Sequence, residues 1–250
     1  MNNRILVTML VALIGGQAKK PEAVPHMRSA TISLGSDRSA YYIGEPVRLT
    51  LTITNVSDEN MSGHFRLGPQ NKRMAIYYRV IGERFQQLPR RQINTTRDVV
   101  VSPMRLGPNE ERKSEALVLL DGTSTRFLLD QAGNYEFYAE GQPWRAQPTD
   151  VVRSGTIQVR IEPPPDRDKE AYAEYIEKAL ARVVEGLILP SDYVSTEDAA
   201  AFLDRYPSSA YSQHVRKGLV QILRYRVVNN RAKPEEKALY QRLRAEDKVN

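Results

Sequence analysis

The feature that most constrains the fold is a strict alternation of apolar and polar residues over residues 47–55. The apolar positions are Val47, Leu49, Leu51 and Ile53, and arginine or threonine stands between them. Successive side chains of a strand point to opposite faces of its sheet, so this pattern predicts a strand with one buried face and one solvated face. Four buried side chains on one strand require further strands to cover them.

Shorter alternating segments occur before and after this strand, separated by turn-forming residues. They cover residues 30–34, 74–81, 84–88, 114–120, 136–140 and 155–161. Seven or so short strands at this spacing predict a two-sheet antiparallel sandwich. Residues 89–109 have poor periodicity and three prolines, so we expect long exposed loops there.

Several of these segments carry recognisable local features. They are a Gly-Glu-Pro entry to the strand that ends at Asn55, a Pro-Asn-Glu turn near Glu110, Gly133-Asn134-Tyr135, Trp144, and a final strand running into prolines. In this combination the chain, over about residues 28–162, resembles the immunoglobulin-like sandwich domains of bacterial exported proteins, including the proteinase-inhibitor-type domain.

The resemblance implies that Tyr135 is a tyrosine corner, whose hydroxyl bonds back to upstream backbone. The antibody pattern is not followed, because Phe137 stands where the second disulfide cysteine would be and the only tryptophan comes after that strand.

Helical spacing replaces alternation after Pro163-Pro164-Pro165. We expect helices over residues 166–189, from Ser195 to about 206, from there to about 228, and from Pro234 onward. Ser195 followed by Asp198 approximates a capping box.

One corner between the expected helices has a distinctive composition, namely Phe202-Leu203, Tyr206-Pro207 and Ser209. It resembles the inter-helix corner of bacterial tetratricopeptide-like repeats. Because stacked repeats need three or more units and one such corner is present, we expect a cap or docking module rather than a solenoid.

These patterns predict a two-domain, all-β plus all-α protein: an antiparallel immunoglobulin-like β-sandwich followed by a small helical bundle of about four helices. The expected segments are a signal peptide over 1–18, a leader over 19–27, the sandwich over 28–162, a proline linker over 163–165 and a tetratricopeptide-like helical module over 166–247. Three extended prolines span only about 9 Å, so we expect the helices to stay near the sandwich.

The N-terminus has the layout of a secretory signal peptide: Arg4, an apolar run over residues 5–14, and Gly16-Gln17-Ala18. We expect cleavage after Ala18 and an extracytoplasmic location, periplasmic or secreted, with an uncleaved anchor as the alternative. The run is shorter than the roughly 20 residues that a membrane-spanning helix needs, and we expect no membrane span after cleavage. The chain contains no cysteine, so packing alone must hold an exported fold together.

Motifs for catalysis and metal binding are missing from the sequence. It has no Gly-x-Ser-x-Gly elbow, His-Glu-x-x-His or calcium loop. The histidines are scattered: His26 falls in the leader, His64 is expected on an exposed strand, and His214 is expected to face solvent on the third helix. We therefore predict a non-enzymatic protein with no catalytic residues, no cofactor and no metal. The thirty acidic residues leave a hydrolytic carboxylate pair open, although no motif indicates one.

The net charge of +6 is concentrated between Lys72 and Arg105, where eight basic residues stand against two acidic ones. This stretch is either a set of solvated strand faces and loop tips or a contact surface for an anionic partner. A nucleic-acid partner is not expected, because the chain is exported and Tyr77 and Tyr78 are the only interleaved aromatics suited to stacking. The candidate partner-binding residues are Arg73, Arg79, Arg84, Arg90, Arg91, Arg97 and, in a proline-flanked bend, Trp144.

The sequence therefore favours an exported binding or scaffold protein that recognises a protein partner or an anionic cell-envelope polymer. The alternative is a proteinase inhibitor that presents an exposed loop of the sandwich, within residues 89–109, to a protease. That alternative rests on the family resemblance. The identity of the partner, the oligomeric state, and whether the helices bind a partner or pack on the sandwich are left open.

Overall fold

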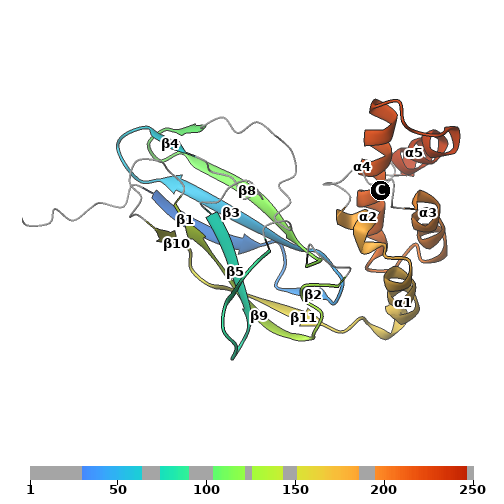
Figure 1. The fold of residues 1–250 in the computed structure, drawn as a ribbon, viewed down its shortest axis with the longest axis horizontal. Helices are drawn as coiled ribbons and strands as arrows, with labels where there is room; N and C mark the ends of the chain where they lie inside the picture. The colour runs from blue at the N-terminus through green and yellow to red at the C-terminus, as the bar shows by residue number, and fades with distance from the viewer. Residues whose placement is uncertain are drawn as a thin grey trace, which may run out of the picture.

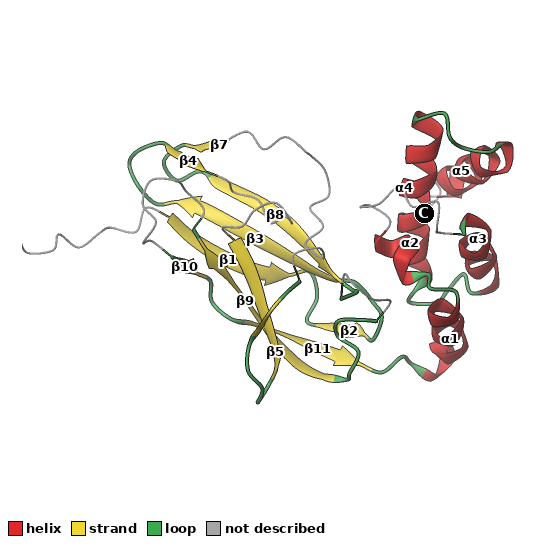
Figure 2. Ribbon diagram, in the orientation of Figure 1, coloured by secondary structure: helices red, strands yellow, loops and turns green. Residues whose placement is uncertain are grey.

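A computed structural model describes residues 30–63, 74–89, 104–121, 126–142, 151–185 and 195–246. The predicted signal peptide and leader lie outside these residues, as does His64. Strands make up the first part of the described chain and helices the last part, and the helices cluster beside one end of the sheets (Figure 1, Figure 2).

The strand predicted from strict alternation is β3 (Val47–Asn55), with the predicted bounds. It is the central strand of a three-stranded antiparallel sheet, between β1 (Ala30–Ser36) and β8 (Glu111–Val118). Buried and half-buried residues alternate along the whole of β3, and Leu49, Leu51 and Ile53 have no exposed surface. The alternation therefore identified both the strand and its buried face correctly.

A second sheet has six strands and faces the first across a shared core. Its order is β2 (Ala40–Tyr42), β11 (Ile157–Glu162), β9 (Gly133–Gly141), β5 (Met74–Val80) and β6 (Gln86–Gln87), with β10 (Val152–Arg153) also paired to β9. A separate ribbon pairs β4 (Met61–Gly63) with β7 (Met104–Leu106).

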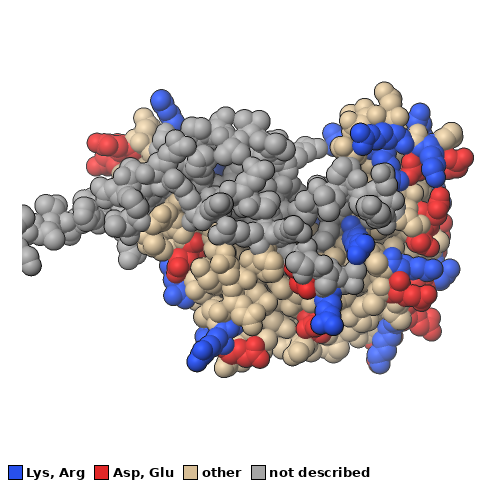
Figure 3. All heavy atoms as spheres, in the orientation of Figure 1, with Lys and Arg blue, Asp and Glu red and all other residues tan. Residues whose placement is uncertain are grey.

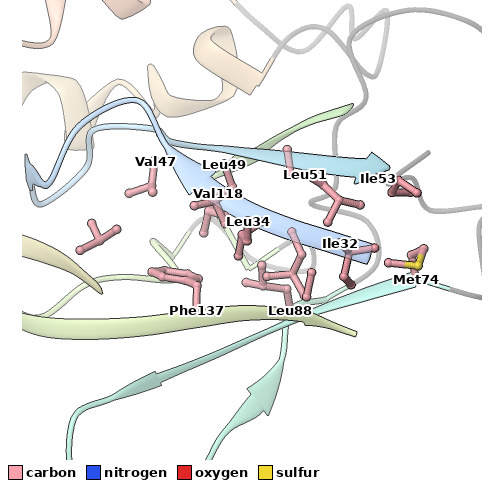
Figure 4. Close-up of a cluster of buried hydrophobic side chains, with 14 of the residues drawn as sticks. Ile32, Leu34, Val47, Leu49, Leu51, Ile53, Met74, Leu88, Val118 and Phe137 are labelled. Carbon is pink, nitrogen blue, oxygen red and sulfur yellow. The ribbon is translucent and has the colours of Figure 1, made fainter. Parts of the chain in front are cut away.

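The core between the two sheets is one continuous apolar cluster. Figure 4 shows Leu49 and Leu51 of β3 opposite Phe137 of β9 and Leu88, and all four belong to this cluster. The hydrogen bond expected of Tyr135 is present, because its hydroxyl donates to the Gln131 carbonyl over 3.0 Å.

The predicted fold class is wrong in two respects. First, β2 runs parallel to β11, with Tyr41 opposite Ile161, so the larger sheet is mixed and the protein is not an antiparallel immunoglobulin-like sandwich. Second, the helices do not form a separate all-α bundle, because their core also contains Leu119 and Leu120, which follow β8. Both features depend on pairing between distant parts of the chain, and a three-residue strand such as β2 is too short for periodicity to reveal.

Within the described ranges five α-helices follow the strands, where about four were predicted. After a short 3₁₀ turn, η2 (Asp166–Asp168), they are α1 (Lys169–Glu177), α2 (Ala181–Glu185), α3 (Thr196–Arg205), α4 (Ser212–Val228) and α5 (Pro234–Glu246). The predicted Ser195 cap is confirmed, because its hydroxyl accepts a hydrogen bond from the Asp198 amide over 3.0 Å. No helix in the described ranges is long and apolar enough to cross a bilayer.

The helix predicted over residues 166–189 is broken between α1 and α2. Ala179 has a φ of 50°, in the left-handed region, and the Leu180 amide donates to the Tyr175 carbonyl over 3.0 Å. This is the geometry of a Schellman helix end, which usually places glycine at the left-handed position. Alanine stands there instead, so no glycine marks the end of the helix in the sequence. The turn places Leu180 beside Tyr175 in the helical core.

Close packing of α2 on α4 depends on Gly218. A methyl group added at Gly218 would lie 2.1 Å from the Val183 carbonyl oxygen and 3.0 Å from the Val184 Cα. Both are backbone atoms of α2, so the two helices would have to separate to admit a side chain.

We therefore predict that Gly218→Ala lowers the free energy of unfolding by about 1–3 kcal/mol, the usual cost of overpacking. An exposed helical glycine would instead gain about 1 kcal/mol from this change. Urea denaturation measures the effect, with Gln221→Ala on the exposed side of α4 as the control. A gain in stability for Gly218→Ala would contradict the packing of α2 on α4.

Candidate functional site

Two of the predicted partner-binding residues fall within the described chain. Arg79 lies on β5, and Arg84 is exposed in the turn between β5 and β6. The other five lie outside the described residues: Arg73, Arg90, Arg91, Arg97 and Trp144.

Arg79 is bound to its own sheet. Its Nη2 lies 2.6 Å from Glu136 Oε2, its Nε donates to the same oxygen, and its guanidinium lies 4.2 Å from the ring centroid of Phe85. Hydrogen bonds from Arg79 and then from Gln158 hold the pKa of Glu136 below its ordinary value. Arg79 therefore positions neighbouring side chains, and it does not offer an open guanidinium to a partner.

The side chains around Arg79 form an aromatic stack on the outer face of the six-stranded sheet. The rings of Tyr77 and Tyr138 stack with centroids 4.8 Å apart and planes 10° apart, and Phe85 contacts Tyr138 edge-on at 4.7 Å. The Arg153 guanidinium lies 3.6 Å from the centroid of Tyr138. We call this set the ladder face; it consists of Tyr77, Arg79, Phe85, Glu136, Tyr138 and Arg153.

Tyr138 is the centre of the ladder face. Strands β5 and β10 pair with opposite edges of β9, since Gly141 is opposite both Met74 and Val152. The Tyr138 ring therefore lies between Tyr77 on one side and Arg153 on the other, and its exposed fraction is only 7%. Burial raises the pKa of the Tyr138 hydroxyl. Sequence reasoning missed this stack because its members come from four separate segments.

Charges of both signs are interleaved along the ladder face. Arg79 is paired with Glu136, exposed Arg84 follows exposed Glu83, and Arg153 is opposite Glu140 in the strand register. Counting the described residues, the face has no large excess of either sign. In the view of Figure 3 the surface visible below the grey region is mainly uncharged, with basic and acidic side chains around it.

A second constellation lies where the helices meet the sheets, at the turn between β2 and β3. The Ile43 carbonyl accepts a hydrogen bond from the Tyr211 hydroxyl over 2.9 Å, and the Gly44 carbonyl accepts one from the Tyr175 hydroxyl over 3.2 Å. Gly44 has a φ of 87°, and a methyl group there would lie 3.1 Å from the Tyr172 ring. The turn therefore requires glycine both for its conformation and for its fit against the aromatic rings.

Glu45 is buried beside this glycine and holds the turn to the helices. Its carboxylate accepts from the Tyr42 amide over 2.8 Å, from His214 Nε2 over 3.2 Å and from Arg38 Nη2 over 3.3 Å. Burial acts to raise the pKa of Glu45, but the bonds from His214 and Tyr42 and the Arg38 charge outweigh it, so the pKa is lowered. We call Gly44, Glu45, Tyr175, Tyr211 and His214 the joint.

The prediction that His214 faces solvent is wrong. Its exposed fraction is 7%, because it lies under the turn against Glu45. The sequence pattern does not reveal this contact, since the two residues are 169 positions apart. Its Nδ1 is buried and has no hydrogen-bond partner in the described part of the chain. A catalytic triad would need a nucleophilic hydroxyl bonded to that nitrogen. The hydrogen bond between Glu45 and His214 instead links the sheets to the helices.

Metal binding finds no support within the described ranges, which hold no cluster of three or more His, Cys, Asp or Glu placed around a common point.

Comparison with known proteins gives little guidance. No protein-family model and no curated protein matches the sequence. The sporulation control protein Spo0M from Bacillus subtilis is 11% identical over 64% of this chain and 56% of its own, with a TM-score of 0.33. The DNA glycosylase AlkC from Pseudomonas fluorescens is 10% identical over 54% of this chain and 30% of its own, with a TM-score of 0.32.

A CARDB domain from Pyrococcus furiosus is 11% identical over 53% of this chain and 87% of its own, with a TM-score of 0.28. Similarities this weak carry no argument about fold or function. The resemblance to proteinase-inhibitor-type domains and the resemblance to tetratricopeptide-like repeats therefore stay predictions.

The joint predicts a specific acid sensitivity. In the folded protein the pKa of the Glu45 carboxyl lies below its ordinary value of 4.5. The ionised carboxylate therefore stabilises the folded state at pH values above 4.5, and this stabilisation is lost as the pH falls through the lowered pKa. We expect Glu45→Gln to cost about 2 kcal/mol at neutral pH, as for a lost hydrogen bond to a buried charge. The cost should shrink progressively below pH 4.5.

Urea unfolding at a series of pH values measures this difference. The matched control is Glu115→Gln on the exposed side of β8, which should follow the wild-type curve. A cost for Glu45→Gln that stays constant from neutral to acid pH would show that the carboxylate charge does not stabilise the joint.

Proposed function

We propose that this chain is an exported, non-enzymatic binding protein that contacts a protein partner through the ladder face. The observation that supports this proposal is the stack of Tyr77, Tyr138 and Arg153 on the outer side of the six-stranded sheet, flanked by Phe85. Tyrosine and arginine are the residue types most enriched in the energetically important centres of protein interfaces.

Rigidity of the ladder face favours binding. Each of its side chains is already held by a ring contact, a cation–π contact or the Arg79–Glu136 ion pair. Side chains that are ordered before binding lose little conformational entropy when a partner arrives. The face is therefore suited to contact a folded surface with little rearrangement.

Its chemistry favours a protein over a cell-envelope polymer. A uniform polyanion would meet Glu83, Glu136 and Glu140 along with the arginines, and like charges in contact oppose binding. A sugar polymer would need an open aromatic ring to stack on, whereas the Tyr138 ring is enclosed by Tyr77 and Arg153. A protein surface can match interleaved charges of both signs.

Export is part of the proposal and rests on the N-terminal sequence, with cleavage after Ala18. The proteinase-inhibitor alternative concerns a loop within residues 89–109, most of which lies outside the described residues. It stays a prediction from the family resemblance.

We predict that replacing Arg153 of the ladder face together with exposed Arg84, which adjoins Phe85 in the sequence, by serine weakens retention of the protein on immobilised cell-envelope extract and reduces the salt dependence of that retention. Loss of two interface arginines should weaken binding about tenfold or more. Treating the extract with a protease before the assay should abolish retention of the wild type.

The matched control is Arg112→Ser with Lys113→Ser on the exposed edge of β8, which makes the same change in net charge away from the ladder face. Thermal unfolding of both variants verifies that they are folded. Equal losses in the two double variants would contradict the proposal, and retention that survives protease treatment would favour a polymer partner instead.

A further inference from the structure

The end of α4 and the start of α5 form a corner whose exposed charges are mostly basic, unlike the mixed charges along the ladder face. Among the residues that the structure describes, the cations exposed at this corner are Arg224, Arg231, Lys233 and Lys237, and the one exposed carboxylate is Glu235. The other two charges at this point, Arg226 and Glu236, form an ion pair inside the corner. In Figure 3 basic side chains gather over the α4–α5 end of the molecule.

Backbone and buried polar contacts fix the shape of this corner. Asn230 has a φ of 55° and ends the helix, and the amides of Arg231 and Ala232 donate to the Arg226 carbonyl. Buried Glu236 accepts from the Lys233 amide over 3.0 Å and from the Thr196 hydroxyl over 3.2 Å. The exposed cations are therefore carried on an ordered turn at one extremity of the chain's fold (Figure 1).

Apolar side chains protrude among these cations. Val228 is 71% exposed and Tyr225 is 43% exposed, and Val228 is the most exposed large apolar side chain in the described part of the chain. Cations near a helix C-terminus are favoured by the helix dipole, which accounts for basic residues in the last turn of α4. The dipole does not account for an exposed valine and tyrosine, nor for Arg231 and Lys233 beyond the helix.

We propose that this corner, built on Arg224, Val228, Arg231 and Lys233, binds the surface of a membrane containing anionic phospholipid. Such a surface supplies negative head groups for the cations and an apolar layer directly beneath them for Val228, with tyrosine favoured at the boundary. An acidic protein or a nucleic acid would satisfy only the charges. The corner is separate from the ladder face, so this inference does not depend on the proposed protein partner.

The test is binding of the full chain to vesicles of phosphatidylcholine mixed with phosphatidylglycerol, compared with vesicles of phosphatidylcholine alone. The apolar run over residues 5–14 could itself attach to either vesicle, so the quantity measured is the difference in affinity between the two. We expect tighter binding to the anionic vesicles, weakening as salt is added because the exposed charges are screened.

Arg231→Ser with Lys233→Ser should reduce the preference for anionic vesicles about 25-fold, since each basic residue near such a surface is worth about a factor of five. Val228→Ser should weaken binding to anionic vesicles several-fold without changing the net charge. The control pair is again Arg112→Ser with Lys113→Ser, which lies on β8. It should leave the preference unchanged.

Three outcomes would overturn the inference. They are the absence of any preference for anionic vesicles, an equal loss in the corner and control pairs, and binding to soluble polyglutamate as tight as to the anionic vesicles. The last would assign the corner to an acidic protein. Circular dichroism of each variant establishes that a loss of binding does not come from unfolding.

Discussion

Gly44 is the point at which the sheets and the helices meet, and the arrangement of both depends on its fit. Any other residue at this position would be strained by the positive φ, and its Cβ would lie within 3.4 Å of three aromatic side chains. The tyrosine hydroxyls that bond to the carbonyls of this turn satisfy polar groups that would otherwise be buried without partners. The buried Glu45–His214 pair adds a charge-assisted contact across the same boundary.

This joint explains why the chain is not two independent domains joined by prolines. Leu119, Leu120 and Phe127, which come from the strand-rich part, pack in the same apolar cluster as α1, α3 and α4. The rings of Tyr175 on α1 and of Tyr211, which directly precedes α4, are fully buried in this contact, so they are not open to a partner. Any partner must approach from the outer surfaces, where the ladder face and the α4–α5 corner lie on the sheet part and the helical part respectively.

Local patterns in the sequence predicted local structure well. Alternation identified β3 and its buried face, and the start of α5 at Pro234 and the cap at Ser195 followed from their residue types. Features that depend on distant contacts were missed, namely the parallel β2–β11 pair, the burial of His214 on Glu45, and the stack of Tyr77, Tyr138 and Arg153. Each joins segments that no periodic pattern links, and the break at Ala179 was missed because alanine stands where glycine is usual.

The most direct test of the account is native-state hydrogen exchange in the wild type and in Gly44→Ala. If the turn couples sheets and helices, the substitution lowers the protection of the slowest-exchanging amides of α4 and of β3 by the same free energy, because both open in one transition. If α4 retains its wild-type protection while β3 loses its own, the helices are stable without the turn and the account is wrong.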